Sequence, residues 1–190
     1  MRLKRTFPPL TPEHSEFLRN KAKPFIAKQP SLVVLRRRML DKGGLEVVWL
    51  QHEPHLYRLI EKGQVFPKSR LRRRFIADSE CHCNAASLWY ESRGCIRIAT
   101  GYALSDSGLW MPHSWGIEAG QIVETTSSQW LSYFGVELSG EEALKFMFAN
   151  ASLSLRERFE RDLVAGACFP ELVEIANAVA DRASSSEIGV

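Results

Sequence analysis

The chain has 190 residues, of which 45% are hydrophobic and 25% are charged. These are the proportions of an ordinary globular protein, and they exclude a mostly disordered chain. No run of about 18 consecutive apolar residues occurs and the basic start lacks the apolar core of a signal peptide, so we expect no membrane span and a cytoplasmic location.

The charges divide unevenly along the chain. Residues 1–75 hold 18 Lys or Arg against 6 Asp or Glu, a net charge of +12, whereas residues 76–190 hold 7 against 16, a net charge of −9. We therefore expect the two parts to have different roles or to attract each other. The length fits one domain over 1–190, with a basic and mostly helical part at 1–78, a core at 79–138 and further helices at 139–190.

The N-terminal part reads as short elements. Residues 11–13 combine an N-cap with a proline at the first helical position, and we expect that helix to be interrupted at Pro24. The apolar runs at 32–35 and 45–50 fit either strands or buried helix pieces. A further helix opens at 53–54 and is closed by Lys62 and Gly63.

Two arginine clusters lie in this basic part. Lys and Arg clusters contact phosphates in nucleic-acid binders, although a solvated or acid-paired face is the more common meaning of such a cluster. The arginines concerned are Arg36, Arg37, Arg38, Arg70, Arg72, Arg73 and Arg74.

A helix is expected over about 80–93, with Asp78 or Ser79 as its N-cap and Gly94 as its stop. Cys81 then lies in the first turn, where free backbone N–H groups and the helix dipole favour the thiolate. Cys83 lies about 200° around the helix from Cys81, so we expect it to face the interior as a small apolar residue.

Asn84, one turn further along this helix, has two readings of equal weight. Together with the free backbone N–H groups it could hold the oxyanion of a tetrahedral intermediate. It could equally serve as a local cap.

Residues 95–104, 109–117 and 121–125 predict a three-stranded meander with turns at 105–108 and 118–120. With a symmetric two- or four-residue second loop, the numbers of paired residues add up to 237, which sets His113 opposite Glu124. Directly opposed side chains suit a carboxylate that orients an imidazole.

The same counting in the first hairpin places Thr100 opposite His113, with Tyr102 and Trp115 flanking a cleft. The plainer alternative makes His113 a satisfied strand histidine and Glu124 an exposed edge charge. Beyond the meander, helices are expected from Ser139, over 155–164 and over 170–180.

Four sequence blocks occur in a fixed order along the chain. They are Cys81-His-Cys-Asn84-Ala85, Gly101-Tyr102-Ala103-Leu104, His113-Ser-Trp115 and Ile122-Val-Glu124-Thr125. This order resembles the papain-like and transglutaminase-like cysteine hydrolase superfamily. It is most similar to an uncharacterised bacterial and phage group with a Cys-x-x-Asn-Ala helix start, a Gly-Tyr-Ala strand, a His-x-Trp strand and an acidic residue before Thr.

The resemblance covers roughly residues 79–136. It implies an α+β fold with a papain-like core, in which a helix carrying the nucleophile packs on a small antiparallel sheet, here with extra N- and C-terminal helices. It implies a Cys-His-Glu triad of Cys81, His113 and Glu124, although Asp or Asn is commoner than Glu at the acid position. Asn84, Tyr102 and Trp115 would then contact the substrate or the oxyanion.

The implied activity is that of a thiol-dependent hydrolase, either a peptidase or an amidase, or of an acyl transferase. It acts on an amide or ester bond of a peptide, amide or acyl substrate through a Cys81 thioester, and it needs no metal and no cofactor.

Two alternatives belong to other classes of function. One is a zinc site, for which the sequence offers Cys81, His82, Cys83, Cys95 and His113, although separated Cys-x-x-Cys pairs are lacking. The other is a non-catalytic module whose basic half binds nucleic acid or an acidic protein.

Overall fold

The computed structural model describes residues 7–169 and residue 172. Within them the chain is a mixed α+β protein, as predicted. The helices are α1 (Pro12–Lys28), α2 (Leu32–Leu40), α3 (Leu56–Lys62), α4 (Cys81–Glu91), α5 (Gly140–Asn150) and α6 (Leu153–Val164), with a 3-10 turn η1 (Lys68–Arg70). The strands are β1 (Glu46–Val47), β2 (Gln64–Phe66), β3 (Leu71–Arg73), β4 (Arg97–Leu104), β5 (Leu109–Glu118), β6 (Gln121–Glu124) and β7 (Ser132–Glu137).

Some predicted features fall outside this part of the chain. The basic segment at 1–5 and, apart from Leu172, the helix expected over 170–180 lie outside the described residues. Within the described residues, no helix is both long and apolar enough to cross a membrane.

The described residues form two compact units, each built from three segments of the chain. The first unit holds 7–71, 100–114 and 127–136, and the second holds 72–99, 115–126 and the residues from 137 onward. Strands β4, β5 and β7 each contribute residues to both units.

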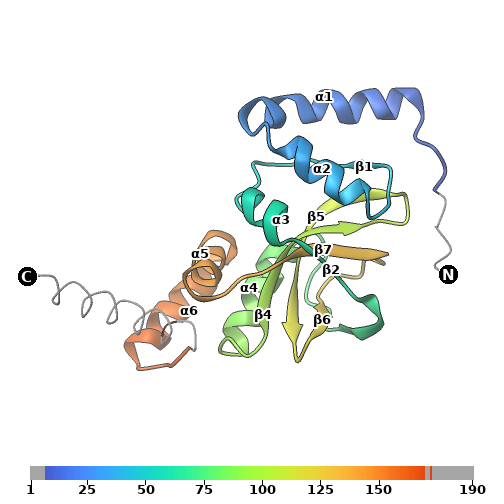
Figure 1. Ribbon diagram of the computed structural model, residues 1–190. Helices are drawn as coiled ribbons and strands as arrows, with labels where there is room; N and C mark the ends of the chain where they lie inside the picture. The colour runs from blue at the N-terminus through green and yellow to red at the C-terminus, as the bar shows by residue number, and fades with distance from the viewer. Residues whose placement is uncertain (1–6, 170–171, 173–190) are drawn as a thin grey trace, which may run out of the picture. The chain divides into compact units, whose positions relative to one another are not determined.

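In the first unit, α2 contacts both α1 and α3 (Figure 1). The prediction that Pro24 interrupts the first helix is wrong, because α1 continues through it to Lys28. A proline inside a helix removes one backbone hydrogen bond, and α1 nevertheless continues beyond Pro24. The side chain of Gln29 accepts a hydrogen bond from the backbone N–H of Glu53 at 2.9 Å and donates one to the Glu53 carbonyl at 3.0 Å.

The apolar runs of the N-terminal part take different structures. Residues 32–35 start helix α2 with Leu32 and Leu35 buried, whereas the run at 45–50 supplies the two-residue strand β1. Strand β1 pairs with β5 in parallel and β2 pairs with β7 antiparallel, so the sheet is mixed rather than purely antiparallel. Strand segments in this unit follow the order β2-β7-β4-β5.

In the second unit, helix α4 packs on the β5–β6 hairpin. Leu88 of α4 is buried in one cluster with Ile96 and Val123. A Cβ atom added to Gly116, which pairs with Val123, would lie 2.7 Å from Ile96 and 3.0 Å from Leu88. The helix therefore lies close against the hairpin backbone.

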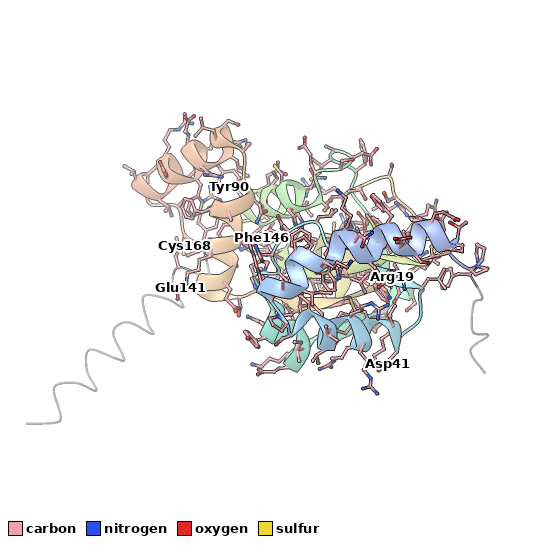
Figure 2. All side chains as sticks on the ribbon, turned by 90° about the horizontal axis from the view of Figure 1, so that it is seen from above. Arg19, Asp41, Tyr90, Glu141, Phe146 and Cys168 are labelled. Atoms are coloured by element: carbon pink, nitrogen blue, oxygen red, sulfur yellow. The ribbon has the colours of Figure 1, made fainter. Side chains whose placement is uncertain are left out.

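Helices α5 and α6 complete the second unit. Helix α5 contacts α4, and the ring of Phe146 on α5 lies 6.0 Å from that of His82. Tyr90 of α4 donates a hydrogen bond to Asp162 of α6 at 2.7 Å. Tyr90 and Phe146 are labelled in Figure 2.

The hairpin register differs from the predicted one. The pairs Gly116 with Val123, Ile117 with Ile122 and Glu118 with Gln121 add up to 239 rather than 237. The turn consists of Ala119 and Gly120 alone, with φ of 48° and 74°, which suits a two-residue hairpin turn. Direct opposition of His113 and Glu124 is therefore wrong, and the next pair in this ladder sets Glu124 opposite Trp115.

Candidate active site

Cys81 is the first residue of α4; it forms no disulfide and is partly buried. The helix spans 81–91 rather than 80–93, and its N-cap is Glu80, which makes no side-chain capping hydrogen bond. Ser79 cannot be the N-cap, because its φ of 61° lies in the left-handed region rather than the extended one. Helix α4 thus begins without a side-chain cap at the predicted nucleophile.

Cys83 is partly buried, as Cys81 is. The predicted contrast between a Cys83 that faces the interior and a more exposed Cys81 is therefore not seen in their burial. The buried residues of α4 begin at Asn84, and the three residues before it are partly buried.

Asn84 holds the chain just before the helix. Its Nδ2 atom donates a hydrogen bond to the carbonyl of Ala77 at 2.7 Å, and the residue is buried. This contact holds the segment before the helix and does not cap a helix N–H group, and it uses one of the two N–H donors of the side chain.

The start of α4 is tied to the end of β6 through the segment before it. The backbone N–H of Arg74 donates to the Glu124 carbonyl at 2.8 Å, and that of Ile76 donates to the Thr125 carbonyl at 2.9 Å. Because Ala77 follows Ile76 and binds Asn84, a short chain of hydrogen bonds links Glu124 and Thr125 to the first turn of α4.

Glu124 is a buried carboxylate with a relative exposure of 0%. Its Oε1 atom accepts hydrogen bonds from the N–H of Thr125 at 2.9 Å, the N–H of Thr126 at 2.9 Å and the hydroxyl of Thr126 at 2.8 Å. An exposed edge charge, the plainer alternative from the sequence, is therefore wrong. Buried carboxylates are rare unless they are hydrogen-bonded or functional.

His113 belongs to the first unit, whereas Cys81 and Glu124 belong to the second. It is buried in β5 at 1% exposure. Its ring centroid lies 4.9 Å from that of Trp130 and 6.1 Å from that of Tyr133. The imidazole is thus enclosed by aromatic rings of its own unit.

Thr100 does not lie opposite His113 as predicted. The hydroxyl of Ser114 donates to that of Thr100 at 2.8 Å, so these two side chains share one face of the sheet. His113, the neighbour of Ser114 in an extended strand, points to the other face. The cause is a three-residue loop closed by the hydrogen bond from the Ser105 N–H to the Leu109 carbonyl.

Tyr102 lies on the face of Thr100, because the two residues are two apart in β4. It therefore does not flank His113. Its hydroxyl donates to Oε2 of Glu53 at 2.8 Å, and its ring meets that of Trp49 edge-on at 5.6 Å. Burial and the nearby Glu53 raise the pKa of Tyr102 well above its usual 10.0.

Glu53 is the partner that the sequence did not reveal. Burial raises the pKa of its carboxyl above 4.5, while hydrogen bonds from His55 and Tyr102 act in the opposite direction. Burial also lowers the pKa of His55 below 6.5, and the charge of Arg58 adds to this effect.

Trp115, the last predicted site residue, is fully buried in the second unit. It lies on the strand face opposite to that of Gly116, and therefore away from Leu88 of α4. The same alternation turns Glu124 away from Val123 and its contact with Leu88.

Several arginines of the two basic clusters pair with acids or carbonyls. Arg36 makes a two-pronged pair with Glu46 at 2.5 and 2.6 Å, Arg72 pairs with Glu118, and Arg74 pairs with Glu91 at 2.8 Å. Arg73 donates to the Thr126 carbonyl at 3.3 Å and Arg38 to the Gly63 carbonyl at 3.5 Å. These contacts fit the acid-paired face more than a prepared phosphate site.

The predicted site residues thus fall into two groups. Cys81, Asn84 and Glu124 are connected by hydrogen-bonded backbone segments within the second unit, whereas Tyr102 has a separate role in the first. Among the described residues, no group of three or more His, Cys, Asp or Glu side chains could hold a metal ion. A scan against protein-family models, a search of curated proteins and a search of solved structures each return no match.

Proposed function

We propose that this chain is a thiol-dependent hydrolase or acyl transferase with a papain-like core, in which Cys81 is the nucleophile, His113 the base and Glu124 the acid that orients it. The observation that carries the proposal is the position of Cys81, a partly exposed cysteine outside any disulfide at the first residue of α4. Unpaired backbone N–H groups at a helix start stabilise a thiolate, which is the attacking species.

A second observation supports the same proposal. Folding buries both an imidazole and a carboxylate, at 1% and 0% exposure. Burying ionisable groups is costly unless they are hydrogen-bonded, and such groups concentrate at functional sites. A strand with a purely structural role requires neither a buried imidazole nor a buried carboxylate.

The reaction would proceed in two steps. His113 takes the thiol proton and the thiolate of Cys81 attacks the carbonyl carbon, forming a tetrahedral oxyanion near the N–H groups of α4. As the bond to the leaving amine or alcohol breaks, His113 returns the proton to that group and a thioester remains. Water, or an acceptor amine in a transferase, then attacks the thioester while His113 takes its proton, and Cys81 is restored.

Alkylation of the native protein tests the nucleophile directly. Iodoacetamide, followed by peptide-resolved mass spectrometry, should modify Cys81 near neutral pH faster than Cys83, Cys95 or Cys168. Cys95 and Cys168 are exposed and act as internal controls for access. Equal, slow modification of all four thiols would remove the proposal.

A further inference from the structure

The side chain of Glu53 lies in the connection between β1 and α3, within the first unit. Its Oε1 atom accepts a hydrogen bond from the backbone N–H of His55 at 3.0 Å, and its Oε2 atom accepts one from the hydroxyl of Tyr102 at 2.8 Å. A carboxylate offers about four acceptor positions. The two contacts therefore fix the orientation of the carboxylate and use about half of its acceptor positions.

The backbone of Glu53 is held separately from its side chain. Gln29, the C-cap residue of α1, accepts a hydrogen bond from the Glu53 N–H at 2.9 Å and donates one to the Glu53 carbonyl at 3.0 Å. Neither bond uses the carboxylate. The carboxylate is thus not required to attach this connection to α1, and it is already fixed in place before any ligand arrives, which lowers the entropic cost of binding.

The described part of the chain supplies no positive charge to this carboxylate, since Glu53 makes no ion pair there. Carboxylates removed from water are normally paired with a cation or fully hydrogen-bonded. Burial raises the pKa of the Glu53 carboxyl more than its two hydrogen bonds lower it, so these neutral donors replace only part of the lost hydration. The adjacent His55 does not supply the charge at neutral pH, because burial lowers the pKa of its ring below 6.5.

Aromatic side chains lie on both sides of Glu53. On one side, Tyr102 and Trp49 are buried and meet edge-on. On the other side, His52 directly precedes Glu53, and its ring meets that of Phe25 edge-on at 5.9 Å. His52 is exposed and Phe25 is partly exposed, so a ligand can reach them from solvent. Aromatic rings accept both an alkyl chain and a cation.

We propose that Glu53 binds an alkylammonium group, either the side chain of a lysine in a peptide or a free primary amine. The ammonium group donates hydrogen bonds to the acceptor positions that His55 and Tyr102 do not use, and the alkyl chain lies against the rings of His52 and Phe25. The ligand supplies the positive charge that the described residues do not. All of these residues belong to the first unit, and the site is independent of the reaction proposed for Cys81.

A purely structural role for Glu53 gives a different outcome. If the carboxylate served only to join the start of α3 to Tyr102, an ammonium ligand would affect Glu53 no more than a neutral ligand of the same shape. The decisive comparison is therefore between a charged ligand and its neutral isostere at the same salt concentration.

The experiment titrates the full-length protein at pH 7 and follows by NMR the amide of His55, which donates to Glu53. Both n-butylammonium and Nα-acetyl-lysine N-methylamide should shift this amide saturably, with dissociation constants of about 1–10 mM. The neutral isosteres 1-butanol and Nα-acetyl-norleucine N-methylamide should not. Tighter binding of the lysine derivative would identify a peptide as the source of the ammonium group, and equal binding of the two ammonium ligands would identify a free amine.

Two variants with the same substitution complete the test. Glu53→Gln removes the charge and keeps the size of the side chain, so it should weaken the binding of n-butylammonium at least about tenfold. Glu61→Gln is the matched control, because Glu61 is exposed on α3, and it should bind as the wild type does.

The proposal is overturned if n-butylammonium and 1-butanol shift the His55 amide equally, or if Glu53→Gln binds n-butylammonium as tightly as Glu61→Gln does. Should Glu53→Gln fail to fold, the comparison of charged and neutral ligands on the wild type decides alone.

Discussion

The hydrogen bond between buried Tyr102 and partly buried Glu53 offers a sharp test of the electrostatics in the first unit. Tyr102→Phe keeps the ring, and with it the edge-on contact with Trp49, and removes only the hydroxyl that donates to Glu53 at 2.8 Å. Because Tyr102 is only 2% exposed, water cannot readily replace the lost donor.

The size of the effect follows from the charge of the acceptor. A hydrogen bond to a charged group contributes about 1.5–3 kcal/mol, against about 0.5–1.5 kcal/mol for a neutral pair. We expect Tyr102→Phe to lower the free energy of unfolding by about 2 kcal/mol at pH 7. For a chain of this length, that corresponds to a melting temperature about 4–8 °C lower.

The loss should depend on pH. Burial raises the pKa of Glu53 above 4.5, so its proton binds more tightly in the folded state than in the unfolded one. The stability that this group contributes is present below its unfolded pKa and is lost as the pH rises through the folded pKa. The ionised carboxylate therefore depends most on Tyr102 at neutral pH, and the variant should lose about 1 kcal/mol less at pH 4.

Urea denaturation of the wild type and the variant at pH 7 and pH 4 measures both quantities. Tyr57→Phe is the control, since Tyr57 lies on α3 with 70% of its surface exposed and should be neutral. An equal loss at both pH values, or a loss no larger than that of Tyr57→Phe, would refute this reasoning.

Three further predictions concern other parts of the chain. Gly101→Ala should lower the free energy of unfolding by at least about 2 kcal/mol in thermal melts, because φ is 154° and the added Cβ would collide with the Phe134 carbonyl. A neutral result would show that β4 and β7 can separate there. Thr125→Val should leave the melting temperature unchanged or raise it, by up to about 1 kcal/mol of stability, because it replaces a buried hydroxyl without a partner; a loss above that amount would mean that the hydroxyl has a partner in solution. Nucleic-acid binding in anisotropy titrations should be weak at 150 mM salt, because Arg36 and Arg72 already pair with acids; tight, salt-sensitive binding would contradict the acid-paired reading.

Local patterns predicted much of the fold. The presence of two turns in the meander, the stop at Gly94 and the helix start after Ser139 are set by residues close in sequence and were confirmed, whereas the exact residues of the two loops were not. Cys81 was placed in a first helical turn for the same reason. Such features depend on capping and turn chemistry, which a sequence displays directly.

The register of the second hairpin was missed because of its turn. A two-residue turn with positive φ at both positions usually carries Asn, Asp or Gly at the first, and here Ala119 occupies it. A shift of one residue in the turn moved the residue opposite Glu124 by two positions, from His113 to Trp115. The hydrogen bonds from Thr126 to Glu124 could have been predicted, since a threonine two residues after an acid is well placed for a local hydrogen bond.

Contacts between residues far apart in the chain could not be predicted from the sequence. Glu53 and Tyr102 are 49 residues apart, and Gln29 and Glu53 are 24 residues apart. No local sequence pattern indicates either contact. Tertiary packing decides such cases, and propensity is only a weak guide to it.

The central claim is that Cys81 and His113 act as one catalytic pair. A crystal structure of the protein tests it most directly, through the distance from the Cys81 sulfur to the nearer ring nitrogen of His113. The account predicts a distance within about 4 Å, with a carboxylate oxygen of Glu124 at hydrogen-bonding distance from the other ring nitrogen. A sulfur beyond the reach of the imidazole, with another side chain between them, would contradict it.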